Sequence, residues 1–167
     1  LAVTKNKDQL VLSEGVFGSL GFSNLNNFIS VSSLNSEFSS YNIEILKYEG
    51  VSEAGNYDYF VGWKGQSLFV VVPEFNDKNS VESIRIESAG IVDEYGVKKG
   101  MTYDELLSLR PNGEIKVNKE TGNADYVYNK SSIYYTFCCL GEPKNEYSIE
   151  DLKTMKILNI NWSNQYN

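Results

Sequence analysis

The acidic residues have the clearest potential for chemistry, because the sequence contains no histidine. Histidine is the commonest acid–base group near neutral pH and the commonest metal ligand, so catalysis would have to rely on carboxylates. Three adjacent acidic pairs occur: Asp93-Glu94, Asp104-Glu105 and Glu150-Asp151. Adjacent side chains point to different sides of a helix or strand and do not face each other. We therefore expect these charges to lie at helix starts and turns, and we expect no catalytic residues and no enzyme activity.

The two cysteines, Cys138 and Cys139, are adjacent. Three interpretations are open: packing on opposite faces of a buried strand, a vicinal disulfide, or metal ligation. We favour the first, which predicts that both side chains are largely buried. Metal ligation is disfavoured, because no histidine or further cysteine can complete a site. We accordingly expect no metal and no cofactor.

Several aromatic residues are spaced so that they share faces of strands. Tyr57, Tyr59 and Trp63 follow the period of two that places side chains on one face, and Tyr126 and Tyr128 repeat this spacing later in the chain. Such a face either forms core beneath a helix or binds a sugar, a lipid or a protein. We predict that these residues form a binding surface if the helices cover the opposite face of the sheet.

Composition and charge restrict the class of protein. The 167 residues suit one domain, and the 41% of apolar residues can build a core. The formal net charge of −7, without a basic stripe, argues against a nucleic-acid partner. No stretch approaches the ~20 apolar residues of a membrane-spanning helix.

Local patterns predict two groups of elements. Thr102 and Glu105 form a capping box at the start of a short helix that ends before Pro111, and Ser23 caps an earlier helix. Alternating or continuous apolar runs indicate strands. The predicted strands are residues 42–48, 57–63, 66–73 and 81–87 in the first half and 114–118, 124–128, 133–140 and 155–162 in the second.

The similar order of these elements predicts an internal duplication. Residues 15–88 and 96–162 would each form a helix followed by a four-stranded antiparallel meander. The predicted fold class is α+β, with two tandem repeats that can join into one larger sheet. Residues 1–14 would form an N-terminal tether, and residues 15–167 a single domain.

Scattered residues carry a resemblance to a known family. They are Gly15, Gly18, Tyr41-Asn42, Glu49-Gly50, residues 63–73, Ile84, Ile86, Gly96-Val97, Gly100, Tyr128, Lys130-Ser131, Ile160 and Trp162. Their order resembles an uncharacterised envelope lipoprotein family of Gram-negative bacteria that is associated with the extracytoplasmic stress response. That family carries a separated cysteine pair near Ile115 and Val127, so Cys138 and Cys139 inherit no role from it.

A second similarity is confined to one segment. Residues 100–106 are similar to the helix start of small outer-membrane assembly lipoproteins and of tandem-repeat β-lactamase-inhibitor proteins, which act by binding proteins. The resemblances together imply a location on the periplasmic side of the cell envelope, with a lipid on a cysteine upstream of Leu1.

These observations predict a non-catalytic envelope domain that binds a protein or a cell-wall component. We expect a monomer whose contact with the membrane is made through the lipid. Two alternatives stay open: an enzyme acting on envelope polysaccharide, which needs two carboxylates across a cleft, and a soluble binder of a small apolar ligand, which needs an enclosed aromatic cavity.

Overall fold

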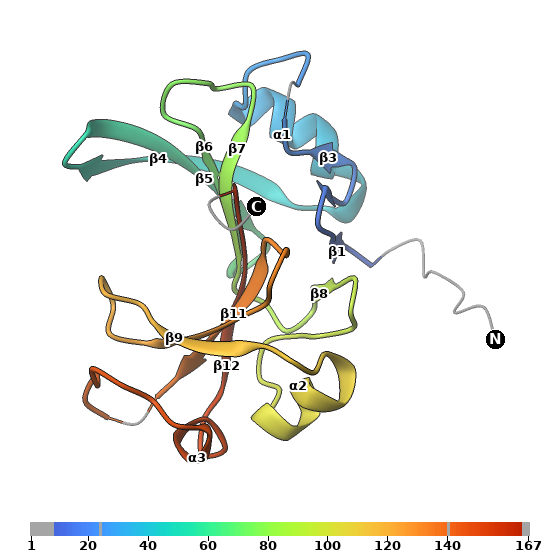
Figure 1. Cartoon of the computed structure of the whole chain (residues 1–167). Coiled ribbons are helices and arrows are strands. Elements are labelled where there is room, and N and C mark those ends of the chain that lie inside the picture. The colour runs from blue at the N-terminus through green and yellow to red at the C-terminus, as the bar shows by residue number, and fades with distance from the viewer. Residues whose placement is uncertain (1–8, 24, 140, 165–167) are drawn as a thin grey trace.

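The protein is built around a large, strongly twisted antiparallel sheet (Figure 1). The computed structural model describes residues 9–23, 25–139 and 141–164. The sheet has eight strands in the order β4-β5-β6-β7-β12-β11-β10-β9. Their bounds are β4 Glu44–Ser52, β5 Gly55–Trp63, β6 Ser67–Pro73, β7 Val81–Ile86, β9 Glu114–Val117, β10 Ala124–Val127, β11 Ile133–Cys138 and β12 Lys156–Ser163.

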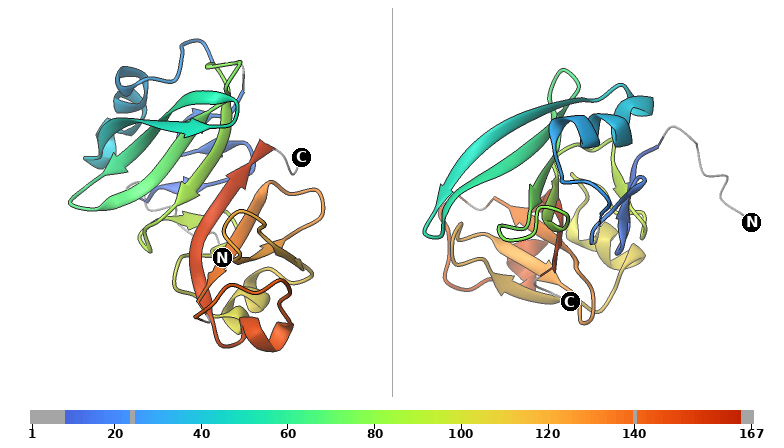
Figure 2. Two further views of the ribbon diagram at one scale, coloured as in Figure 1. Left: turned by 90° about the vertical axis from the view of Figure 1, so that its left-hand side faces the viewer. Right: turned by 90° about the horizontal axis from the view of Figure 1, so that it is seen from above.

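A small sheet packs against one face of the large one (Figures 1 and 2). Its strands lie in the order β3-β2-β1-β8, with β1 and β8 parallel and the other pairs antiparallel. The strands are β1 Val11–Leu12, β2 Val16–Phe17, β3 Leu20–Gly21 and β8 Val92–Asp93. The small sheet thus joins residues that lie about eighty positions apart in the sequence.

The helices are short, and each begins with a capping box. Helix α1 spans Val31–Phe38, α2 spans Tyr103–Leu109 and α3 spans Ile149–Leu152, with a 3₁₀ turn η1 at Ser39–Tyr41. The predicted box of α2 is present, because Thr102 accepts from the backbone of Glu105 and the Glu105 carboxylate accepts from that of Thr102. No helix in the described ranges is both long and apolar enough to cross a membrane.

The core lies between the large sheet on one side and the small sheet with α1 and α2 on the other. Three fully buried rings meet there: Phe17 of β2, Phe38 of α1 and Phe69 of β6, with centroids 4.9–5.2 Å apart. Phe22 packs on Trp162 of β12 at 4.1 Å. These aromatic contacts hold the small sheet on the large one.

The predicted α+β class with two tandem helix-plus-meander repeats is wrong. The described chain is mostly β, with twelve strands in two sheets of four and eight strands and three short helices. The first predicted repeat, from residue 15, was expected to begin with a helix, but the segment around Gly15 and Gly18 pairs as strands. The helix expected to start at Ser23 starts after Ser30. Helices of four to eight residues add little to a fold dominated by strands.

The individual strand predictions agree better with the structure, since each predicted strand overlaps a strand of the large sheet. The predicted strand 133–140 ends at Cys138, and residue 140 lies outside the described residues. In the expected tether, residues 1–8 also lie outside them, whereas Val11–Leu12 forms β1.

The packing of Phe69 against Gly62 gives a test of the core. A Cβ atom at Gly62 would lie 2.3 Å from the Phe69 ring. Gly62→Ala should lower the free energy of unfolding by about 1–3 kcal/mol, because the buried ring must shift. Gly15→Ala is the control, since no atom lies within 4 Å of a Cβ there. Urea unfolding measures both variants, and equal stabilities would contradict this account of the core.

Candidate functional site

One face of the large sheet is open, and a row of directly paired residues crosses it from β4 to β11. The row consists of Leu46, Val61, Val70, Arg85, Asn161 and Tyr134. Val61 and Val70 are buried, yet neither belongs to the hydrophobic core on the other face. The left-hand view of Figure 2 turns this face toward the viewer, and no helix covers its centre.

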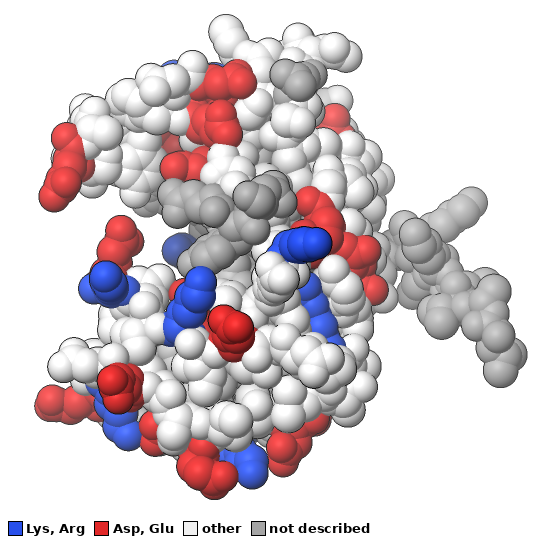
Figure 3. Space-filling view, in the orientation of Figure 1, with Lys and Arg blue, Asp and Glu red and all other residues white. Residues whose placement is uncertain are grey.

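The open face is hollowed. In Figure 3 a recess lies at the left, between the β4–β5 hairpin above and the β9–β10 side of the sheet below. We call it the open groove. Strand alternation turns ten side chains toward this side of the sheet, of which the last five are buried: Tyr48, Tyr57, Tyr59, Arg85, Tyr134, Val61, Val70, Thr136, Asn161 and Asp125.

Tyrosine rings form one wall of the groove. Tyr48 and Tyr59 are directly paired across β4 and β5 and stack with centroids 5.5 Å apart at an interplanar angle of 18°. Tyr57 lies next to Tyr59 with centroids 6.1 Å apart. Tyr48 is 45% exposed, and the other two are half-buried. The wall therefore presents flat apolar surfaces with phenol groups at their edges.

A hydrogen-bonded polar row forms the floor beside it. Asn161 Nδ2 donates to Thr136 Oγ1 at 3.0 Å, and Thr136 Oγ1 donates to Asp125 Oδ1 at 2.7 Å. Asn118 Nδ2 donates to Asp125 Oδ2 at 3.4 Å. Burial raises the pKa of Asp125 above its ordinary value of 3.8, and the bonds from Thr136 and Asn118 oppose that rise. The floor is thus preorganised and polar.

Arg85 lies in the middle of the groove, between Val70 on one side and Asn161 on the other. Its Nε donates to Glu87 Oε1 at 2.8 Å, and its side chain is 51% exposed. A guanidinium group offers five donors in a planar fork, so Arg85 can bind a carboxylate or hydroxyl oxygens of a ligand in the groove.

The structure divides the predicted aromatic row. Tyr57 and Tyr59 face the open groove, and Trp63 lies 39% exposed beside the bulge at the end of β5. Tyr126 is buried on the core face, edge-on to Tyr103 of α2, with centroids 5.6 Å apart. Tyr128 is half-buried and also lies on the core side. The five residues therefore do not form one surface, because the core-facing side of β10 is the side that carries its tyrosine.

A buried arginine on the core side was not predicted as a functional residue. Arg110, the C-cap of α2, is 7% exposed, and its guanidinium carbon lies 3.8 Å from the centroid of the Tyr95 ring and 3.7 Å from that of Tyr128. Its Nη1 donates to Ile133 O and Tyr135 Oη at 3.0 and 3.1 Å, respectively. Cation–π contacts on two faces and hydrogen bonds at the edge satisfy the charge.

Two acids from the small-sheet region complete this cluster. Glu14 Oε1 lies 3.7 Å from Arg110 Nη2, and Glu14 also accepts from Ser131 Oγ and from the backbone of Ser132. Asp93 accepts from Tyr135 Oη and from the backbone of Tyr95 and Val97. Burial raises the pKa of Asp93, although these hydrogen bonds and Arg110 oppose the rise. We call Glu14 and Asp93, together with Arg110, Tyr95, Tyr128 and Tyr135, the Arg110 cluster.

Sequence patterns indicate this cluster only in part. Arg110 stands at the end of a capped helix and before a proline, where a basic residue is ordinarily explained by the helix dipole. Its acidic partner Glu14 lies 96 positions away, and no short spacing pattern connects the two. Only the pairing of β1 with β8 brings Glu14 and Asp93 to the same place.

The cysteine prediction is wrong in its favoured form. Cys138 and Cys139 form a vicinal disulfide, one of the three interpretations, and do not pack on opposite faces. Cys138 is half-buried and Cys139 is exposed, at the end of β11. In the parts of the chain that the structure describes, no group of three or more acidic or cysteine side chains is arranged to hold a metal.

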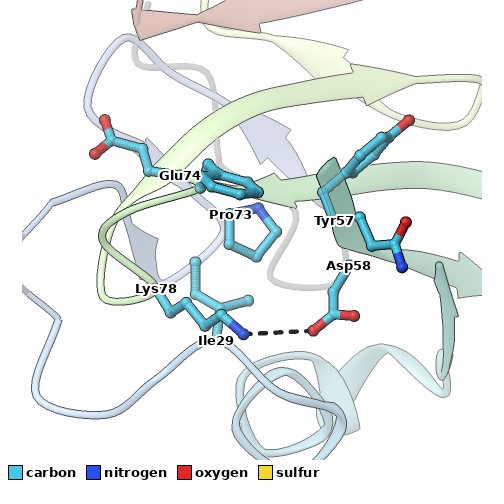
Figure 4. A pocket seen from close by; sticks show the side chains of 8 residues that line it. Ile29, Tyr57, Asp58, Pro73, Glu74 and Lys78 are labelled. Atoms are coloured by element: carbon cyan, nitrogen blue, oxygen red, sulfur yellow. Dashed lines mark ion pairs between the residues drawn. The ribbon is translucent and has the colours of Figure 1, made fainter. Parts of the chain in front are cut away.

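A pocket of about 210 Å³ lies where β5 begins and β6 ends (Figure 4), and it shares Tyr57 with the groove. Its lining includes Ile29, Tyr57, Asp58, Pro73, Phe75 and Lys78. The Asp58 carboxylate is placed between two lysines, with Lys78 Nζ at 3.8 Å and Lys47 Nζ at 3.7 Å. The volume is below the ~300–1,000 Å³ of sites for drug-sized ligands, so the pocket suits a fragment of a larger ligand.

The Arg110 cluster predicts a large effect on stability. Arg110→Met should lower the free energy of unfolding by about 3–5 kcal/mol, because Asp93 and Glu14 lose their buried counter-charge. Arg110→Lys should recover part of this loss, since a lysine keeps the charge but not the planar fork. Arg85→Met is the matched control and should stay within ~0.5 kcal/mol. A loss in Arg110→Met no larger than in Arg85→Met, measured by urea unfolding at pH 7, would refute this role.

Asp125 predicts a pH dependence of stability. Its folded pKa is raised above the unfolded value, so the stability it contributes is fully present below the unfolded pKa and is lost as the pH rises through the folded pKa. Asp125→Asn does not titrate. The stability of this variant relative to the unchanged protein should therefore increase as the pH is raised from 4 to 7. Chemical denaturation across this pH range measures the difference, and a difference that is constant or that falls with pH would contradict the assignment.

The fold has a counterpart among solved structures. No family model matches the sequence, and no curated protein matches it. The crystal structure of the uncharacterized protein yfeY from Escherichia coli is similar to this chain with a TM-score of 0.73 and 18% sequence identity, covering 92% of this chain and 99% of that chain. This likeness shows a shared fold with an uncharacterised protein from a Gram-negative bacterium.

Proposed function

We propose that this chain is a non-catalytic binding domain of the bacterial cell envelope and that it binds a cell-wall glycan in the open groove. The proposal rests chiefly on one observation: the stacked wall of Tyr48 and Tyr59 stands beside a polar floor in a hollow of the sheet. A binding role was predicted from the aromatic residues, and we propose the groove as its place.

The chemistry of the groove suits a sugar chain. A pyranose ring has an apolar face of C–H groups, which packs on a flat aromatic ring, and a rim of hydroxyl groups, which needs donors and acceptors. Tyr48 and Tyr59 supply the flat surfaces, whereas Arg85 offers donors from the centre of the groove. A groove between two projecting parts of a sheet can also admit an extended chain at both ends, as a polymer requires.

The envelope location is supported by the sequence resemblance to a Gram-negative lipoprotein family. The structural likeness to an uncharacterised protein of a Gram-negative bacterium agrees with that location. We propose that the chain lies on the periplasmic side and that a lipid on a cysteine upstream of Leu1 anchors it. Metabolic labelling of the full-length gene product with a radioactive fatty acid tests the anchor directly.

Asp125 favours a second candidate, an enzyme acting on envelope polysaccharide. A carboxyl group with a raised pKa in a groove can serve as a general acid. Glycoside hydrolysis also requires a second carboxylate within about 5–10 Å across the scissile bond. Asp125 is 3% exposed, and both its oxygens accept hydrogen bonds from neighbouring side chains, which supports a structural role in the floor.

Binding to purified peptidoglycan sacculi tests the proposed function. Tyr59→Ala should weaken co-sedimentation with sacculi by about tenfold, since stacking of one aromatic ring is worth roughly 0.5–1.5 kcal/mol beyond its buried area. Phe28→Ala is the matched control, because Phe28 is 66% exposed and lies outside the groove. The melting temperature of each variant shows whether the fold is intact.

The outcomes separate the two candidates. Equal binding by the unchanged protein and Tyr59→Ala would show that the groove is not the site, and absence of binding by the unchanged protein would refute the cell-wall ligand. Release of soluble glycan fragments that stops in Asp125→Asn would replace the binding role with hydrolysis.

A further inference from the structure

The two edges of the large sheet differ in length and exposure. At one edge, β9 has four residues, whereas at the other β4 has nine. Short edge strands are a common protection against pairing with other chains. Strand β4 pairs with β5 on its inner side, and no backbone group of the described residues pairs with its outer side. Figure 1 shows the β4–β5 hairpin projecting from the body of the protein.

Strand β4 also carries exposed apolar side chains. Val51 is 83% exposed and Tyr48 is 45% exposed. The strand contains no proline, which would block pairing, and Ile45 near its start is buried. A long edge with exposed apolar residues and free backbone groups is a template for a further strand.

The charged residues of β4 indicate which strand can pair best with its outer edge. Two copies of a sheet can join edge to edge through antiparallel pairing about a two-fold axis perpendicular to the sheet. In such a pair, residues that lie opposite each other share a face, so the axis passes midway between the two copies of one residue, which we describe as the residue on the axis. With Tyr48 on the axis, Lys47 lies opposite Glu49 of the partner subunit, and this ion pair occurs twice.

Neighbouring registers are unfavourable. An axis through Lys47 would place two lysines opposite each other, and an axis through Glu49 would oppose two carboxylates. Like charges in directly opposite positions destabilise a strand pair, whereas opposite charges stabilise it. The register centred on Tyr48 also places the exposed Val51 opposite Ile45 of the partner subunit. The sequence of β4 is therefore complementary to itself in this register.

We propose that two copies of this chain associate by antiparallel pairing of their β4 strands with Tyr48 on the two-fold axis. The two large sheets then form one continuous sheet, and their open grooves lie on the same face. Lys47 and Glu49 point to the opposite face from Tyr48 by strand alternation, so their charges can be exchanged without changing a side chain of the groove wall. This proposal differs from the monomer expected from the sequence.

Charge exchange at the interface tests the proposal. Sedimentation equilibrium of the full chain should show a concentration-dependent dimer. Lys47→Glu and Glu49→Lys should each weaken self-association by about tenfold or more, since each places like charges opposite each other twice. The double variant K47E/E49K should restore the dimer. Lys119→Glu, in the turn between β9 and β10, is the control for a change of charge elsewhere and should dimerise normally.

Mixing the two single variants sharpens the test. A chain with Lys47→Glu presents two carboxylates and a chain with Glu49→Lys presents two lysines, so the mixture should form a heterodimer with both ion pairs restored. Lys47 also lies 3.7 Å from Asp58, and thermal unfolding of each variant therefore checks the fold. A protein that stays monomeric at all concentrations, single variants that dimerise normally, or a mixture that does not associate would each overturn the proposal.

Discussion

The burial of the Arg110 charge constrains much of the arrangement around it. A guanidinium group removed from water must find counter-charges and acceptors, and Arg110 finds them in three separate parts of the chain. Glu14 comes from the turn after β1, Asp93 from β8 through Tyr135, and the remaining acceptors from the start of β11. Because Arg110 follows α2 and its partners come from the regions of both sheets, the cluster fixes how the small sheet sits on the large one.

This attachment decides which face of the large sheet is free. Phe17, Phe22 and Trp162 bury the contact between the sheets, and the Trp162 indole donates to Glu14 O at 2.8 Å. The small sheet and the helices then occupy one face, so the twist of the large sheet leaves the other face hollow. The stability of the core side and the accessibility of the groove are thus two consequences of one packing arrangement.

The pocket near Asp58 and the groove have different characters. The pocket carries an acid between two lysines, so its charges largely compensate each other. The groove combines flat rings with a hydrogen-bonded floor and an exposed guanidinium. The groove therefore offers more varied contacts to a ligand.

The strands of the large sheet and the start of α2 were predictable from local sequence patterns, because alternation and capping act between residues a few positions apart. The small sheet was not predictable in this way, since strands of two residues such as Val11–Leu12 are too short for a periodic pattern. Strand alternation placed Tyr57 with Tyr59 and Tyr126 with Tyr128, but only the packing of α2 decided that Tyr126 faces the core. The Arg110 cluster and the open groove also belong to the tertiary structure, because each joins residues that only long-range strand pairing brings together.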